Sequence, residues 1–187
     1  MQMTVVLVEL VIIGGEVSAW LFVLFSLHSG FLTLLERAFE FDGAIIIFAC
    51  FCYVLGIAFD RIVDHATDCY EKKCKSIKGI PDDVVAEFVL KDAGIADGYY
   101  GSMSSRKRIM RATFFNALIA CAVLGIAAIK HLVFKNHSMA LLFVLLMVGT
   151  GTLAFISFFA ARKIIMGFYG KVKKAYDRCE KKKTAKE

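Results

Sequence analysis

Residues 7–25 read LVELVIIGGEVSAWLFVLF, an apolar stretch that is interrupted by two carboxylates, Glu9 and Glu16. A hydrocarbon core of about 30 Å is crossed by about 20 helical residues, so the stretch has the length of a transmembrane helix. With its flanks it forms the first of four apolar runs, at 5–27, 44–59, 112–129 and 139–161. The chain has 187 residues, of which 58% are hydrophobic. We therefore predict an all-α membrane protein with four transmembrane helices.

Lysine and arginine are distributed unevenly along the chain. Of the 23 such residues, ten lie in 61–111 and ten in 162–187. Positively charged loops stay cytoplasmic. We therefore expect a multi-pass protein of the cell inner (plasma) membrane with both termini inside. The segments are then a first transmembrane hairpin (1–61), a cytoplasmic helical extension and loop (62–111), a second transmembrane hairpin (112–161) and a basic cytoplasmic tail (162–187).

The first apolar run is expected to be retained rather than cleaved as a secretory signal. The preceding MQMTVV lacks a basic region, and a glutamate is unusual inside the apolar part of a signal peptide. The net charge of +6 is explained by topology, so we expect no direct binding of nucleic acid.

The segment between the second and third spans predicts a small helical insertion. The second helix should continue past its apolar part through 58–75. A short amphipathic helix follows at 80–94, with Pro81 in its first turn and Gly94 as its stop. Residues 97–105 are typical of a flexible connector, after which Ser104 or Ser105 caps the third helix.

The two carboxylates of the first span lie seven residues apart and therefore share one helical face. Glu9 should lie near the inner boundary and Glu16 about 10 Å deeper. We expect Glu9 to pair with Arg61 or to form a hydrogen bond with Asn116. Glu16 is expected to be protonated and to donate to the intramembrane hydroxyls of Thr150 or Thr152, or to a backbone carbonyl. Two interpretations remain open. The carboxylates are either polar ties between helices or subunits, or the lining of an ion, proton or ligand path.

Small residues predict where helices approach closely. Gly149 and Gly151 are expected to pack against the small residues of 14–19, and further small residues recur at Cys52 and Gly56 and along Ala117, Cys121 and Gly125. Because a four-helix protomer has little interior, several such faces also indicate self-association.

The end of the second span carries an ionic group at the inner boundary, formed by Asp60, Arg61, Asp64 and His65. The carboxylates of Asp60, Asp64 and Asp68 recur every fourth residue and thus share one helical edge, where they could chelate a divalent cation. Nearby Arg61, Lys72 and Lys73 favour an ordinary ionic helix edge instead.

No motif indicates a metal, a cofactor or catalysis. The histidines lie at the membrane boundaries rather than as a deep pair suited to haem, and Cys69 and Cys74 form no CxxC motif. No nucleophile elbow, phosphate loop or zinc-protease motif is present. We therefore expect neither metal nor cofactor, and no enzyme.

The layout predicts an oligomeric membrane anchor or sensor that contacts lipid, further copies of itself and a cytoplasmic protein partner. A subunit of a stress or antiviral defence complex would fit it. The expected docking residues are Asp82, Asp83, Glu87, Tyr99, Tyr100, Arg106, Lys107 and Arg108. One alternative is an oligomeric ion or proton channel, or a small-solute carrier, lined by Glu16. Another is a membrane enzyme or redox protein.

Overall fold

The computed structural model describes residues 2–27, 43–81, 86 and 97–184. Within these ranges the chain folds into four long helices: α1 (Gln2–Ser26), α3 (Ala44–Ile77), α5 (Asp97–Val133) and α6 (His137–Thr184). Each contains a stretch long and apolar enough to span a membrane. The prediction of an all-helical chain with four such helices is confirmed, and this architecture is compatible with a multi-pass membrane protein.

Helix α3 extends well beyond its apolar part, as the sequence predicts. It begins after Gly43, whose carbonyl accepts hydrogen bonds from the amides of Ile46 and Ile47. It ends in a left-handed turn at Gly79, where φ is 63°. The amide of Ile80 there bonds to the carbonyl of Lys75 at 3.3 Å, which satisfies an orphan carbonyl of the last turn.

Helix α5 begins earlier than predicted. It starts at Asp97 and runs without a break through 101–105, so the expected connector and the cap at Ser104 or Ser105 are wrong. Of the expected helix at 80–94, the structure describes only Ile80, Pro81 and Ala86, and the other residues lie outside the described ranges. The segment boundaries at 61/62, 111/112 and 161/162 fall inside continuous helices.

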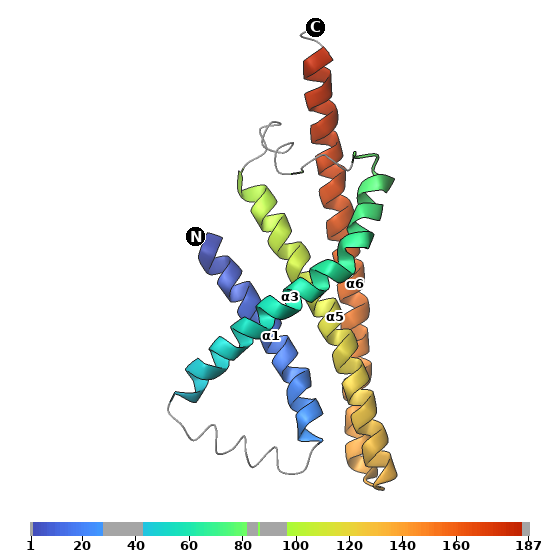
Figure 1. Ribbon diagram of the computed structural model, residues 1–187. Coiled ribbons are helices and arrows are strands. Elements are labelled where there is room, and N and C mark those ends of the chain that lie inside the picture. The colour runs from blue at the N-terminus through green and yellow to red at the C-terminus, as the bar shows by residue number, and fades with distance from the viewer. Residues whose placement is uncertain (1, 28–42, 82–85, 87–96, 185–187) are drawn as a thin grey trace.

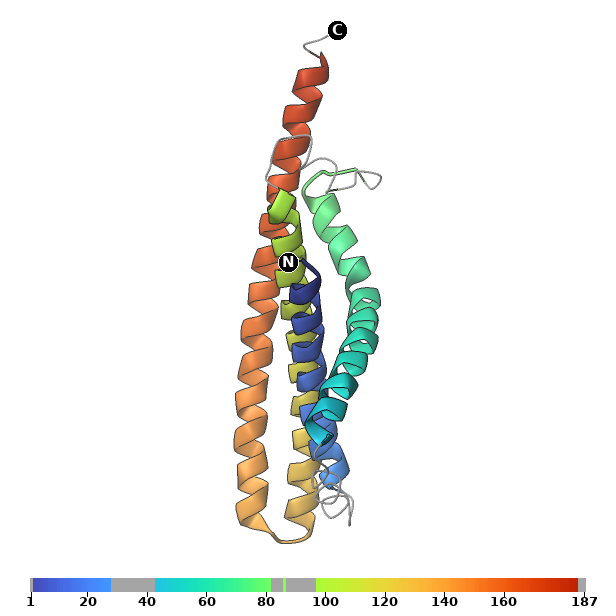
Figure 2. The same ribbon diagram turned by 90° about the vertical axis from the view of Figure 1, so that its left-hand side faces the viewer.

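The helices alternate in direction and form an open arrangement rather than a closed bundle. Helices α1 and α5 run one way and α3 and α6 return (Figure 1). Packing follows the order α6, α5, α1, α3 (Figure 2), and α1 does not contact α6 within the described residues. Helix α3 crosses the others obliquely, and it also contacts α5 and α6.

Helices α1 and α3 form the first hairpin and cross backbone to backbone. A Cβ atom added to Gly14 would lie 1.6 Å from the carbonyl oxygen of Cys52, and one added to Gly56 would lie 1.9 Å from that of Leu10. Only glycine allows this approach. The expected contact between Gly14 and the glycines of the last span is therefore wrong, because α3 occupies that surface of α1. The predicted close packing at Gly56 is confirmed.

Helices α5 and α6 form the second hairpin and lie side by side. Asn136 is the N-cap of α6, because its side-chain oxygen accepts a hydrogen bond from the amide of Met139 at 3.3 Å. The predicted small-residue ladder of α5 faces α6. The Cys121 thiol bonds to the carbonyl of Met147 at 3.6 Å, and a Cβ on Gly125 would lie 3.4 Å from the Met147 sulfur.

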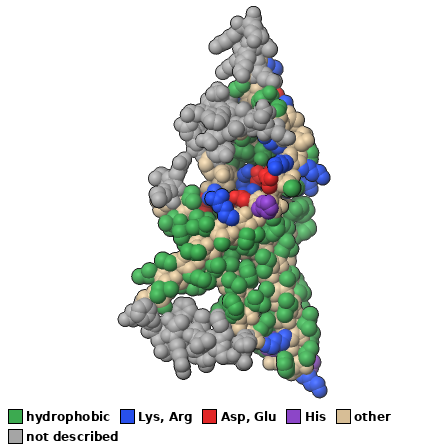
Figure 3. Space-filling model, in the orientation of Figure 1, with side chains coloured by type: hydrophobic (Ala, Val, Ile, Leu, Met, Phe, Trp, Pro, Cys, Tyr) green, Lys and Arg blue, Asp and Glu red, His purple; other side chains and the backbone are tan. Residues whose placement is uncertain are grey.

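Charged side chains gather at one end of the molecule, which we call the basic end. In Figure 3 they lie above a broad apolar band, and few appear at the opposite end. The helices continue past this charged level and still pack together there. A cluster of buried side chains joins the end of α3, Ile80 and the far part of α6; it comprises Cys74, Ile80, Ile165, Phe168, Tyr169, Val172 and Ala175.

Candidate functional site

A seam of polar contacts joins the two hairpins from the basic end into the apolar band. In every ion pair that the described residues form across this polar seam, the first hairpin supplies the carboxylate and the second supplies the cation. The residues of the polar seam are Glu9, Glu16, Trp20, Asp60, Asp64, Thr67 and Glu71 from the first hairpin, and Lys107, Arg108, Arg111, Thr113, Asn116 and Tyr169 from the second.

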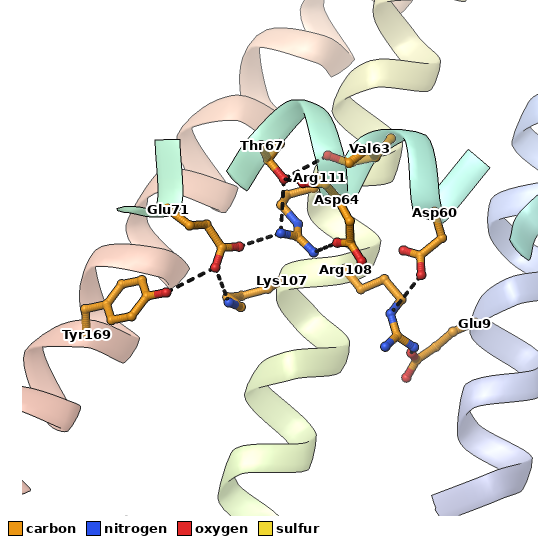
Figure 4. A network of polar contacts seen from close by, with 10 residues as sticks. All are labelled: Glu9, Asp60, Val63, Asp64, Thr67, Glu71, Lys107, Arg108, Arg111 and Tyr169. Atoms are coloured by element: carbon orange, nitrogen blue, oxygen red, sulfur yellow. Dashed lines mark hydrogen bonds and ion pairs between the residues drawn. The ribbon is translucent and has the colours of Figure 1, made fainter. Parts of the chain in front are cut away.

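Arg111 is the centre of the seam at the basic end. Its guanidinium pairs with Asp64 and with Glu71, and it donates a hydrogen bond of 3.1 Å to the hydroxyl of Thr67 (Figure 4). The side chain of Arg111 is only 12% exposed. The planar fork of arginine suits such multiple contacts, so one α5 residue fixes two turns of α3.

Glu71 collects three donors from the second hairpin. Besides Arg111, it accepts a hydrogen bond of 2.8 Å from Lys107 and one of 3.1 Å from the Tyr169 hydroxyl. The Lys107 ammonium also lies 5.2 Å from the ring centre of Phe168, within cation–π range. Glu71 therefore connects α3 to both helices of the second hairpin.

Arg108 bridges the two helices of the first hairpin. Its guanidinium lies 3.5 Å from Glu9 and 3.3 Å from Asp60. Glu9 is buried, at 3% exposure, and its Oε2 atom accepts no hydrogen bond within the described part of the chain. Arg108 is therefore its compensating charge. The expected pairing of Glu9 with Arg61 or Asn116 is wrong: Arg61 is exposed on α3, and Asn116 lies deeper.

Glu16 is held by neutral donors instead. It accepts hydrogen bonds from the Thr113 hydroxyl at 2.8 Å and from the Asn116 amide at 2.9 Å. The Asn116 side-chain oxygen in turn accepts a hydrogen bond from the Trp20 indole at 3.0 Å. Both carboxylate oxygens and both ends of the amide are thus engaged, as a polar group at this depth requires.

The expected partners of Glu16 on the last span are wrong. The hydroxyls of Thr150 and Thr152 bond to carbonyls of their own helix, Leu146, Met147 and Val148. Thr152 is exposed on the outside of α6, and α1 does not contact α6 within the described residues. The open packing order therefore keeps these hydroxyls away from Glu16.

A constant sequence offset identifies the partners that the sequence analysis missed. Because α1 and α5 run in the same direction, their contacts keep nearly one register: Glu16 meets Thr113 and Asn116 at separations of 97 and 100 residues, and Trp20 meets Asn116 at 96. The same offset leads from Glu9 to Arg108. The sequence does contain a signal for these partners: the polar residues of α1 and of α5 follow each other at similar spacings, as expected for two parallel helices in contact.

The residues expected to dock a partner divide into three groups. Lys107 and Arg108 form ion pairs of the polar seam, and a docking role for them stays a prediction. Arg106 is exposed on α5. Tyr99 and Tyr100 lie in the first turns of α5, but their side chains, like Asp82, Asp83 and Glu87, lie outside the described residues.

The acidic edge of α3 is divided among separate cations. Asp60 pairs with Arg108, Asp64 with Arg111, and Asp68 with Lys72 at 2.7 Å. The expected neighbour Lys72 is confirmed, whereas Arg61 and His65 point outward as exposed residues. No three potential ligands from His, Cys, Asp or Glu gather at one point in the described ranges. The arrangement fits structural ionic contacts better than chelation of a metal.

The polar seam acts chemically as a set of matched charges and hydrogen bonds that fixes one hairpin on the other. A search of protein-family models, curated proteins and solved structures finds no match to this chain.

Proposed function

We propose that the chain is a membrane anchor that holds a docking stalk for an acidic cytoplasmic protein. The stalk is the part of α6 beyond Arg162 together with the ends of α3 and α5 that pack on it. The proposal takes the basic end as cytoplasmic, following the distribution of Lys and Arg.

The length and straight course of α6 support a stalk. The helix has 48 residues, so it is about 72 Å long, more than twice the roughly 30 Å of a hydrocarbon core. It continues past the other elements in both views (Figures 1 and 2). Isolated helices are marginal in water, so the packed cluster of Ile165, Phe168 and Val172 against α3 supports its structure outside the bilayer.

A basic ridge on the outer face of this stalk is the observation that carries the proposal. The exposed residues follow each other at spacings of three, four or eight along one helical face; they are Lys163, Lys171, Lys174, Arg178 and Lys181. The opposite face is the packed one, with Val172 and Ala175 buried. Helix α6 thus presents positive charge to the solvent on one face, while its apolar face packs against α3.

An acidic protein suits this ridge better than the membrane surface does. Lys181 lies 19 residues beyond Arg162, which corresponds to about 28 Å along the helix. At physiological ionic strength, charges are screened over about 8 Å. Most of the ridge is therefore too far from lipid headgroups at the bilayer boundary to be attracted by them.

Self-association is the second part of the proposal. Gly149 is exposed on α6 with open space where a Cβ atom would be, and Thr152 is exposed on the same helix. Small residues on an unoccupied helix face allow close packing between copies within a membrane. The size of the wild-type particle in mild detergent, compared with that of Gly149→Leu, tests this part.

The docking experiment uses the full chain purified in mild detergent. The double variant Lys174→Glu/Arg178→Glu should lose a co-purifying acidic protein that the wild type retains, and high salt should release it. Lys135→Glu is the matched control, because it reverses an exposed charge at the opposite end. Retained binding by the double variant would overturn the proposal.

Two further outcomes would also overturn it. If the double variant loses only its binding to vesicles of anionic lipid, the ridge binds membranes. If the wild-type chain alone conducts ions in liposomes and Glu16→Gln abolishes the flux, the chain is a channel.

A further inference from the structure

A cavity of about 160 Å³ lies where α3, α5 and α6 meet, beside the polar seam. Ala66, Thr67 and Tyr70 line it from α3, and Arg111, Phe114 and Phe115 from α5. The side formed by α6 consists of Phe158, Ala161, Arg162 and Ile165. These last residues mark the place where the apolar run of α6 ends and its charged part begins, so the cavity lies at the membrane boundary.

The size of the cavity limits what it can hold. Drug-sized ligands and cofactors occupy pockets of about 300–1,000 Å³, which is larger than this space. At about 30 Å³ for each water-sized group, it accepts roughly five such groups. A short length of hydrocarbon chain has this volume, whereas a flavin or a haem does not.

The chemistry of the walls favours hydrocarbon over water. Most of the lining is aromatic or aliphatic. Of its polar groups, the Thr67 hydroxyl donates to the carbonyl of Val63 at 2.8 Å and Arg111 pairs with Asp64 and Glu71, while the Nε–H of Arg111 has no acceptor within the described residues. A buried water needs two to four polar partners. Phe158 is 38% exposed, so the space has a wall that faces the bilayer.

Arg162 gives this apolar space one charged corner. Within the described ranges no carboxylate pairs with Arg162, whereas Arg111 on the facing wall pairs with two. Arg162 is exposed and directly follows the apolar run of α6. With that run inside the hydrocarbon core, Arg162 lies at the level of the lipid phosphates. Arginine binds phosphate through charge-assisted hydrogen bonds.

We infer that the cavity between α3, α5 and α6 binds one anionic phospholipid, with the first part of an acyl chain against Phe114 and Phe158 and its phosphate on Arg162. The inference is independent of the docking function, because Arg162 is not part of the basic ridge and four of the five ridge residues, from Lys171 onward, lie beyond the last α6 residue that lines the cavity. A lipid bound there fills the space between α3 and α6 beside the contacts that these helices already make through Glu71 and Tyr169 and through the cluster around Cys74.

The test is a titration of the delipidated full chain in detergent, read by native mass spectrometry. The probes are phosphatidylglycerol, phosphatidylcholine and glycerol phosphate. Phosphatidylglycerol should bind most tightly, and Arg162→Gln should weaken it roughly tenfold, the value expected for one charge-assisted hydrogen bond. Lys163→Gln is the matched control, because this exposed neighbour does not line the cavity and should change the affinity by less than about twofold.

A second variant tests the hydrocarbon part without changing charge. Ala66 lines the cavity but is itself exposed, so Ala66→Phe can fill the space without displacing buried residues. It should reduce phosphatidylglycerol binding while the unfolding temperature measured without lipid stays close to that of the wild type. The inference is wrong if Arg162→Gln and Lys163→Gln act equally, if glycerol phosphate binds as tightly as the lipid, or if Ala66→Phe has no effect.

Discussion

The two hairpins of this molecule differ in both charge and packing. The first hairpin crosses through Gly14 and Gly56 and directs its carboxylates toward the second. The second lies side by side along a small-residue ladder and directs arginine, lysine, hydroxyl and amide donors toward the first. Neither hairpin alone satisfies its own polar groups at this interface. The difference therefore specifies which hairpin packs on which, since two copies of one kind would leave like groups facing each other.

The means of compensation also changes with depth. At the basic end, Glu9 and Glu71 face cations. In the apolar band, Glu16 faces only an amide and a hydroxyl. A guanidinium so far inside would add the cost of burying a second charge, whereas neutral donors add less. The four variants below change, in turn, the basic end of the polar seam, the crossing of the first hairpin, the deep part of the seam and an exposed ion pair outside it.

The largest effect is expected from Arg111→Gln. This change removes the cation that Asp64 and Glu71 share and leaves Glu71 with Lys107 alone, so it should lower the free energy of unfolding by about 3 kcal/mol. Denaturation in detergent followed by circular dichroism measures it. Arg106→Gln is the matched control, because this residue of the same helix is exposed. Equal destabilisation by the two variants would contradict the central place of Arg111 in the polar seam.

Gly14→Ala should be the next most destabilising change. A methyl group there meets the backbone of Cys52, so the first hairpin must separate at its crossing, at a cost of about 2 kcal/mol. Gly15→Ala provides the control, because among the described residues nothing beyond the neighbouring backbone of α1 lies within 4 Å of a Cβ atom at that position. The same unfolding measurement should separate these neighbours. If Gly15→Ala proves the more harmful, the crossing is wrongly placed.

Asn116→Leu probes the deep part of the seam and should cost about 1–2 kcal/mol, the range for a hydrogen-bonded group inside a membrane helix pair. It removes a donor from Glu16 and an acceptor from Trp20. Trp20 is the single tryptophan of the chain, so its fluorescence reports directly on this contact. The emission should move to shorter wavelength, because the indole loses its polar partner. Thr152→Val, exposed on α6, should leave the spectrum unchanged.

The smallest effect is expected from Lys72→Gln. Its ion pair with Asp68 spans one turn of α3, and the two side chains are 69% and 55% exposed. Such a pair contributes about 0.3–0.5 kcal/mol, and salt screens it. The difference from wild type should vanish in high salt, whereas that of Arg111→Gln should persist. A salt-independent effect at Lys72 would mean that the pair is part of the buried network.

The helices could be predicted from the sequence because lipid imposes a simple rule on apolar length. The four spans and the extension of α3 follow from hydropathy and helical continuity, and the close approach at Gly56 follows from its lack of a side chain. The start of α5 was misjudged because glycine and serine in 97–105 resemble a connector. Their weak local preference was overridden by the helix that follows.

The partners of the carboxylates could not be predicted to the residue. Pairing depends on how far each helix slides along its neighbour, and a shift of two turns exchanges Arg108 for Asn116 beside Glu9. Hydropathy determines the position of one helix along its neighbour only to within a few residues. The expectation that Thr150 meets Glu16 required the first and last spans to be in contact, whereas α5 lies between α1 and α6. Which helices are neighbours is a property of the whole assembly.

The unbroken course of α6 also makes it a mechanical lever. Thr184 lies 22 residues beyond Arg162, an arm of about 33 Å with no proline along it to absorb bending. A rotation of about 10° at Arg162, shared by the ends of α3 and α5 that pack on α6, would move the far end by roughly 6 Å, given that helical rise. Small changes in how the spans tilt, as bilayer thickness varies, are thereby magnified into displacements as large as a side chain at the remote tip.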